Sequence, residues 1–262
     1  EAKQRITAAI SEVPPIADLK PGSLAPFLDT PQLSRTIVQQ ETRRLEDKLA
    51  ELKKLDADIH TNAVAKELGD YFAAYEKRLS ETEEKAKVSI DLLKASLIIA
   101  SVDEEEINIP AYLRQVDRMV KDIQATLAED CNPADIRNAL NRYLYEDNGF
   151  HGARFDYYHR ANSYMNRLLD DREGLPITLS ILYMELGTRL GLDIEGVGIP
   201  GHFIVRQLID GKPVFLDPFD DARILNLDEV KALATNGRPA LFEDRFLETA
   251  SAKTILMRML NN

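Results

Sequence analysis

The feature that most constrains the fold of this chain is a change of hydrophobic periodicity near residue 194. Before that point, apolar residues recur at spacings of three and four, which is typical of amphipathic helices. After it, three short segments are predicted to be strands, at 194–199, 202–208 and 213–217. Asp210-Gly211 is a tight-turn signal between the last two. The sequence therefore predicts an α+β fold, with helices first and a small antiparallel sheet after them.

Helices account for most of the remaining chain. The helix that begins at Pro176 carries apolar residues on more than one stripe, so we expect it to be central. Residues 1–85 are predicted to form a helical N-terminal extension, and residues 86–262 a domain with a helical lead-in and C-terminal helices. The predicted helices span residues 1–12, 34–55, 62–79, 84–101, 110–129, 133–145, 162–170, 176–191, 227–234 and 251–260.

The composition narrows the classes of function. The chain has 33 basic and 44 acidic residues and a formal net charge of -11, which argues against a nucleic-acid surface. Its longest apolar stretch, residues 92–102, contains Lys94 and is shorter than the roughly 20 residues of a spanning helix, so we expect no membrane segment. The single cysteine, Cys131, excludes an intrachain disulfide and fits a reducing compartment. We therefore expect a cytoplasmic protein.

The sequence carries no cofactor motif. It has no glycine-rich phosphate loop and no strong metal-ligand spacing. His151 and His159 lie close together along the chain, but a metal site would need further ligands at fixed geometry. We expect neither a cofactor nor a metal.

The hairpin places a histidine and an aspartate on one face. If Asp210-Gly211 is a two-residue loop, Ile209 faces Lys212 and Asp217 lies opposite Ile204. Residues two apart on a strand share a face, so His202 becomes a diagonal neighbour of Asp217, at roughly 7 Å between backbones. We predict that Asp217 orients and charge-stabilises the His202 imidazole as in a catalytic triad. The alternative is a pair that only braces the hairpin.

Five segments in this half of the chain carry a resemblance to a known family. They are "NSYMN" (162–166), "REGLPITL" (172–179), "RLGL" (189–192), "PGHFIVR" (200–206) and "LDPF" (216–219). With them, the chain resembles the bacterial SirB-type transglutaminase-like family over about residues 88–225. The resemblance implies a papain-like core, in which a helix carries a cysteine at its N-terminus and a sheet supplies a histidine and an aspartate.

The resemblance also shows where the chain departs from an active enzyme. The histidine and aspartate positions map to His202 and Asp217, whereas the cysteine position maps to Pro176, which has neither thiol nor hydroxyl. We therefore predict a pseudo-enzyme that uses its cleft to bind a peptide or protein partner.

Three residues keep an enzymatic alternative open. Thr178 and Ser180 lie in the first turns of the same helix, and Cys131 precedes another helix start. One of them, paired with His202 and Asp217, would give an amide or ester hydrolase or an acyl transferase. The ordinary roles are capping or back-bonding for such hydroxyls and an inert buried side chain for a lone cysteine.

The other motif residues are predicted to shape the cleft. Gly174 and Pro176 set the start of the central helix, and Pro200-Gly201 shapes the approach to the histidine strand. Asn162 belongs to the same set. Arg206 lies on the His202 face, where it binds either a carboxylate in the cleft or a structural acid.

The N-terminal extension offers a separate interaction surface. Its apolar residues are interleaved with Glu, Lys and Arg, which indicates a solvated amphipathic helix or a short coiled-coil arm. We expect this arm to self-associate or to dock a partner. A helix packed on its own domain is the alternative. The apolar residues are Ile37, Leu45, Leu49, Leu52 and Leu55.

Overall fold

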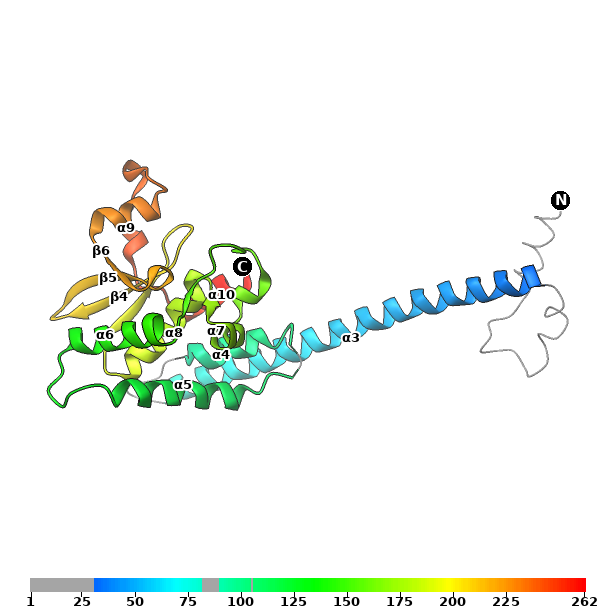
Figure 1. The fold of residues 1–262 in the computed structure, drawn as a ribbon, viewed down its shortest axis with the longest axis horizontal. Helices are drawn as coiled ribbons and strands as arrows, with labels where there is room; N and C mark the ends of the chain where they lie inside the picture. Colours follow the sequence, from blue (N-terminus) through cyan, green and yellow to red (C-terminus); the bar gives the residue numbers. More distant parts are fainter. Residues whose placement is uncertain (1–30, 82–89, 105) are drawn as a thin grey trace. The chain divides into compact units, whose positions relative to one another are not determined.

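The computed structural model describes residues 31–81, 90–104 and 106–262 (Figure 1). The fold is α+β, as the sequence predicted, and the chain divides into two compact units, Glu1–Asn62 and Ala63–Asn262. The predicted helix at 1–12 and the predicted domain boundary between residues 85 and 86 lie outside the described residues and stay predictions.

The first described element is α3, a single helix of 51 residues from Pro31 to Glu81. The sequence predicted two helices with a break at residues 56–61, and this prediction was wrong. The stretch contains neither Pro nor Gly, and Asp, His and Thr each lower helix propensity by only about 0.7 kcal/mol or less. No local signal is therefore strong enough to stop the helix. None of the described helices is both long and apolar enough to cross a membrane.

Three of the helices that precede the sheet begin after a polar N-cap residue. Asp91, Asn108 and Asn132 each accept a hydrogen bond from a first-turn backbone N–H, which satisfies donors that a helix start leaves free. A π-helical turn, Arg142–Asp147, extends the third of these helices. The helices are α4 (Leu92–Ala100), α5 (Ile109–Gln124), α6 (Pro133–Asn141), α7 (Met165–Asp171) and α8 (Pro176–Arg189).

Helix α8 is central, as its sequence predicted. Every side chain from Pro176 to Met184 is buried. Tyr183 is completely buried, and its hydroxyl donates to Asn141 Oδ1 at 2.6 Å, which gives the phenol the partner that burial requires. A helix that is apolar on all sides must be covered on all sides.

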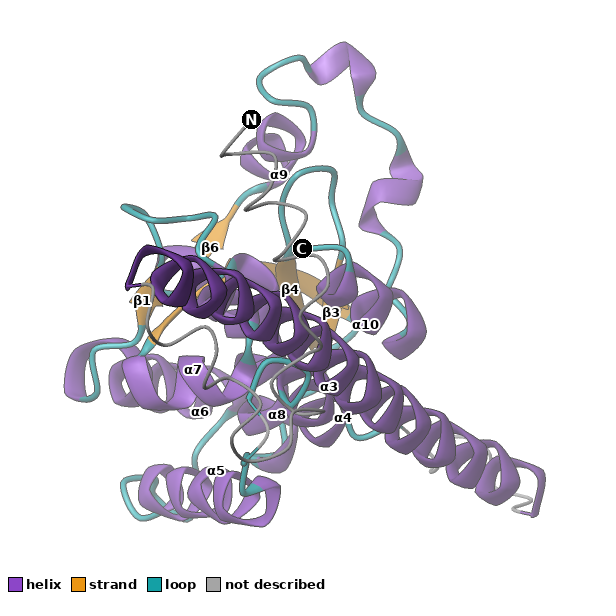
Figure 2. Cartoon of the chain, turned by 90° about the vertical axis from the view of Figure 1, so that its right-hand side faces the viewer, coloured by secondary structure: helices purple, strands orange, loops and turns teal. Residues whose placement is uncertain are grey.

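The sheet has four antiparallel strands in chain order. Strands are drawn in orange in Figure 2. Ile209 pairs with Lys212 and Val205 with Leu216, so the predicted hairpin register is confirmed. Asp210 and Gly211 both have positive φ, as a two-residue hairpin turn demands. The short strand β6 was not predicted. The strands are β3 (Ile194–Val197), β4 (Ile204–Ile209), β5 (Lys212–Asp217) and β6 (Arg223–Leu225). A separate parallel pair joins β1 (His151–Gly152) to β2 (Glu173–Gly174).

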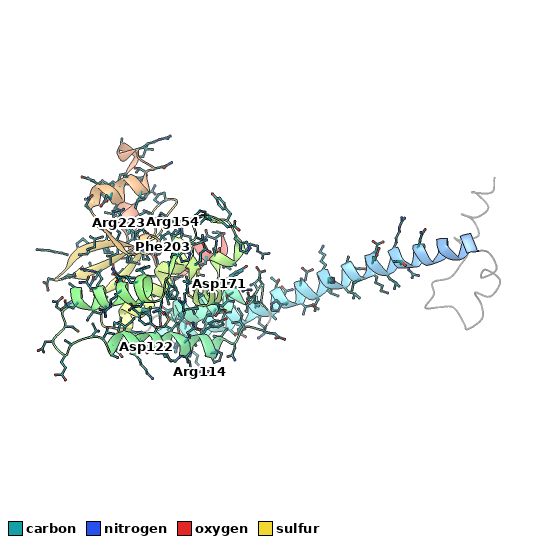
Figure 3. All side chains as sticks on the ribbon, viewed as in Figure 1. Arg114, Asp122, Arg154, Asp171, Phe203 and Arg223 are labelled. Atoms are coloured by element: carbon teal, nitrogen blue, oxygen red, sulfur yellow. The ribbon has the colours of Figure 1, made fainter. Side chains whose placement is uncertain are left out.

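The sheet is covered on both faces. Phe203 (labelled in Figure 3), Val205 and Leu216 belong to the main core with α8. Ile204 and Phe215 point the other way, into a second cluster that includes residues of α9 (Leu227–Ala234). The last helix, α10 (Ala252–Leu260), adds Ile255, Leu256 and Met259 to the main core. Alternate residues of one strand therefore serve two cores.

We expect Gly196→Ala to destabilise the sheet. A Cβ at Gly196 would lie 2.8 Å from Phe203 Cζ and 3.2 Å from Met184 Sδ, so the tightly packed ring has to move. Overpacking of this kind lowers the free energy of unfolding by about 1–3 kcal/mol. Urea denaturation followed by circular dichroism measures it.

The matched control is Gly69→Ala in α3, where a Cβ meets nothing within 4 Å. This change should leave stability unchanged or raise it by up to about 1 kcal/mol, because alanine favours helix. Equal stability of the wild type and Gly196→Ala would contradict the close packing described here.

Candidate functional site

His202 and Asp217 form a close, largely buried pair. His202 Nε2 lies 2.9 Å from Asp217 Oδ2, and the side chains are 16% and 6% exposed. A carboxylate only accepts hydrogen bonds, so the imidazole donates through Nε2 and its Nδ1 is left as the second functional nitrogen. The structure therefore gives His202 the oriented imidazole that a general base or a hydrogen-bonding recognition group needs.

The turn that follows β5 holds the imidazole from two sides. Asp217 Oδ1 accepts a hydrogen bond from Phe219 N at 3.1 Å while its other oxygen faces His202. The Phe219 ring meets the His202 ring edge-to-face, with centroids 5.9 Å apart and planes at 87°. One short segment, Asp217-Pro218-Phe219, thus fixes both the hydrogen bond and the tilt of the imidazole.

Phe219 is itself fixed by its neighbours. Tyr157 packs edge-to-face against it at 6.1 Å, and the Arg154 guanidinium lies 5.8 Å from the ring centroid. A Cβ at Gly152 would lie 2.6 Å from the Phe219 ring, so only glycine allows this approach. Arg154 also donates to Asp220 at 2.6 Å and, together with a second arginine, lowers the pKa of that carboxyl. The loop at 153–160 is therefore tied to the Asp217–Phe219 turn.

A groove of about 560 Å³ adjoins His202. Gly201, with φ of +74°, lets the chain turn immediately before the histidine, and Pro200 forms part of the same wall. The opposite wall comes from the C-terminal end of α9 and the segment after it, and it is mostly apolar. The lining residues are Pro200, Gly201, His202, Leu233, Ala234, Thr235, Asn236, Leu241 and Phe246.

Hydrogen bonds to backbone carbonyls hold the N-terminus of α8 in place. The Asn162 carbonyl accepts from Leu175 N at 3.2 Å and from Thr178 Oγ1 at 3.1 Å. Thr178 is fully buried and also donates to the Leu175 carbonyl at 3.0 Å. A Cβ at Gly174 would lie 2.7 Å from Thr178 Oγ1, which explains the glycine. Pro176, buried in the first turn, follows this junction.

The other two nucleophile candidates, Ser180 and Cys131, lie in different environments. Ser180 is fully buried, and its hydroxyl lies 3.4 Å from the Phe203 carbonyl, to which it donates. Cys131 is partly exposed and lines a different pocket, of about 460 Å³, near the start of α6. The structure thus brings His202 and Asp217 together, and it gives Thr178 and Ser180 backbone partners in the core.

Arg206 binds a structural acid, which is one of the two roles that the sequence left open. Its guanidinium pairs with Glu195 on the neighbouring strand β3 and donates to the Leu247 carbonyl at 3.1 Å and to Thr249 Oγ1 at 2.7 Å. It is not among the residues that line the groove next to His202. The hydrogen bond from Arg206 lowers the pKa of the Glu195 carboxyl.

His151, in β1, and His159 make local contacts. His151 Nδ1 lies 3.0 Å from the Gly149 carbonyl, and its Nε2 lies 3.9 Å from Glu173. His159 Nδ1 accepts from Ala161 N at 3.3 Å. Within the described ranges, no group of three or more His, Cys, Asp or Glu side chains could hold a metal ion.

Comparison with known families accounts for this arrangement. The profile described as "Transglutaminase-like superfamily" matches residues 110–261, which include α8, the sheet and both members of the His–Asp pair. The chain belongs to the transglutaminase-like superfamily. No solved structure matches it significantly.

The chain is also similar to bacterial and mammalian proteins. A UPF0162 protein from Xylella fastidiosa (strain Temecula1) is 32% identical over 182 residues, covering 66% of this chain and 64% of that protein. One from Vibrio cholerae is 24% identical over 175 residues, with the same coverage. The human F-box only protein 21 is 32% identical over 133 residues, which cover 49% of this chain and 21% of that protein. The chain thus spans slightly less than two thirds of the length of these UPF0162 relatives.

Sequence reasoning missed several residues of this transglutaminase-like site. Phe219 was seen only as part of a motif, and Gly152 was not singled out at all. The Asp-Pro-Phe order could have indicated that the Phe219 ring lies near His202, since a residue two positions after Asp217 returns toward the same side of the chain. The far groove wall, with Leu241 and Phe246, carries no local signal, because it comes from packing between segments distant in the chain.

We expect the Arg206–Glu195 pair to make stability depend on pH. The folded-state pKa of Glu195 is lowered, so its contribution is complete above the unfolded value of about 4.3 and is lost as pH falls through the folded value. The stability difference between the wild type and Glu195→Gln should therefore be largest near neutral pH and shrink below about pH 5. Urea denaturation from neutral to acidic pH measures it.

The control uses Arg206→Met, which removes the cation. In that background, Glu195→Gln should lose most of its pH-dependent effect on stability. An unchanged pH dependence would show that Arg206 is not its source.

Proposed function

We propose that this transglutaminase-like domain is non-catalytic and binds a peptide or protein partner through the groove beside His202. One observation carries the proposal: an ordered His202–Asp217 pair adjoins an apolar groove. In addition, Pro176 begins α8 at the position to which the family resemblance maps the nucleophile. The proposal includes the SirB-type assignment and a cytoplasmic location, and it involves neither nucleic acid nor a cofactor.

The surroundings of the nearby hydroxyls support the absence of an attacking group. A nucleophile has to lie within hydrogen-bond reach of its base. The Thr178 hydroxyl instead donates to two backbone carbonyls, and that of Ser180 donates to the Phe203 carbonyl. Both side chains are completely buried, so using either one would require breaking contacts that hold α8 in place.

The groove supports binding of an apolar segment. Its volume of about 560 Å³ falls within the range of roughly 300–1,000 Å³ typical of ligand sites. Leu233 and Leu241, which line it, are 37% and 59% exposed, so an apolar partner would remove their surface from water. The Nδ1 atom of His202 can then accept a hydrogen bond from a backbone N–H of the bound segment. An apolar peptide stretch satisfies both features.

The alternative is an active amide or ester hydrolase or an acyl transferase that uses Thr178, Ser180 or Cys131. The observation in its favour is the His202–Asp217 distance of 2.9 Å, which suits a base and its orienting acid. The two proposals differ in whether a covalent adduct depends on His202.

We expect no labelling that requires His202. The wild type and His202→Ala are incubated with a fluorophosphonate, which reacts with activated hydroxyls, and with iodoacetamide, which reacts with thiols. Any Cys131 adduct should form equally in both proteins, because Cys131 lines a different pocket. Mass spectrometry of the intact and digested chains measures it. An adduct on Thr178, Ser180 or Cys131 that disappears in His202→Ala would establish the enzymatic alternative.

We expect groove substitutions to weaken peptide binding. Peptides are selected on the wild type from a random displayed library, and their affinities are measured by fluorescence anisotropy. Leu233→Glu and Leu241→Glu place a charge on the apolar wall and should each weaken binding at least about tenfold, or about 1.4 kcal/mol. Circular dichroism checks that the variants are folded.

The matched control is Leu227→Glu, at the first turn of the same helix α9. Leu227 is 45% exposed and does not line the groove. Glutamate near a helix N-terminus is tolerated, so both fold and affinity should be unchanged. Equal losses in Leu227→Glu and Leu241→Glu would place the binding surface elsewhere.

A further inference from the structure

Between Thr42 and Ile59, helix α3 presents an apolar stripe to solvent. Every side chain from Thr42 to Ile59 is exposed. The large apolar members of this stretch are each more than half exposed: Leu45, Leu49, Leu52, Leu55 and Ile59. Most helical stability in proteins comes from packing an apolar face, so this stretch lacks the burial that ordinarily maintains a helix.

The spacing of the stripe is that of a coiled coil. Leu45, Leu52 and Ile59 are seven residues apart, and Leu49 lies between the first two. In heptad notation, Leu49 occupies an a position, and Leu45, Leu52 and Ile59 occupy d positions. Leu55 falls at a g position, and Thr42 and Asp56 occupy the other two a positions. A seam this narrow fits another helix rather than a broad globular surface.

The charges of the stripe indicate what that other helix is. Between Thr42 and Asn62 there are five basic and five acidic residues, although the whole chain has a net charge of -11. A segment balanced in this way has no one-signed complement, whereas an identical segment carries both signs. Balanced charge therefore favours a second copy of this chain over a strongly acidic or basic partner.

The e and g positions then decide the orientation. In a parallel pair, Lys48 at g would face Lys53 at e of the second copy, which is repulsive. In an antiparallel pair with Leu49 packed across Leu52, e positions face e positions. Glu46 of each copy then meets Lys53 of the other, and two-fold symmetry forms this contact twice.

From these observations, we infer that residues 42–62 pair with the same segment of a second chain as an antiparallel two-helix coiled coil. The residues of this coiled coil lie outside the groove beside His202, so a test of the coiled coil does not test the proposed function.

Sedimentation equilibrium of the full 262-residue chain tests the inference. We expect a dimer at micromolar concentration and a monomer for Leu49→Ser, whereas Ala50→Ser, on the outer face, should dimerise like the wild type. Lys53→Glu and Glu46→Lys should each weaken dimerisation about fivefold to tenfold, and the double variant should recover most of it. A wild type that stays monomeric, or a Lys53→Glu variant that dimerises more tightly, would overturn the proposal.

Spin labels measure the orientation directly. In a Cys131→Ser background, Thr61→Cys carries one label per chain, and dipolar spectroscopy gives the distance between the two labels. Antiparallel pairing about Leu49 and Leu52 separates them by roughly 30 Å along the axis. Parallel pairing would place the two labels at the same height along the axis, separated only across the pair by the helix spacing of about 10 Å and the outward reach of the labels, and would refute the proposed arrangement.

Discussion

The burial of α8 is the constraint on which the domain depends. Its side chains are buried without interruption from Pro176 to Met184, so the helix has to be enclosed on every side. The sheet covers one side through Phe203, Val205 and Leu216, while the preceding helices and α10 cover the others. Since β4 and β5 are held against α8, the loop before β4 and the turn after β5 are held too. The position of the His202–Asp217 pair follows from this enclosure.

The packing at the start of α8 does not depend on a nucleophile. The start of α8 is stabilised by the Asn162 carbonyl, by the Thr178 hydroxyl and by the close approach of Gly174, and none of these contacts needs a reactive group. The Asp217–His202 bond likewise braces the end of the hairpin whatever chemistry follows. A fold of this kind can lose an attacking atom at little energetic cost, which is why superfamily membership alone does not establish activity.

The sequence predicted those features that follow from local periodicity. A two-residue turn and a side-chain period of two were sufficient to bring His202 to Asp217, and the all-round apolar pattern from Pro176 was sufficient to make α8 central. It could not predict which acid pairs with Arg206, because Glu195 lies on another strand whose register no turn fixes. The groove wall at Leu241 was equally hidden, since it is formed by packing across the fold.

The orientation of the coiled coil would also affect how the groove can be used. Two copies joined through α3 carry two grooves, and avidity for a partner depends on whether both can be engaged at once. In a parallel pair, both chains would continue from the same end of the coiled coil, so their two domains would begin close together. Antiparallel pairing sends them from opposite ends, so a single short peptide would bind each groove separately. A gain from dimerisation would then require a long or repetitive partner, and affinity for a single isolated peptide should not depend on the state of α3.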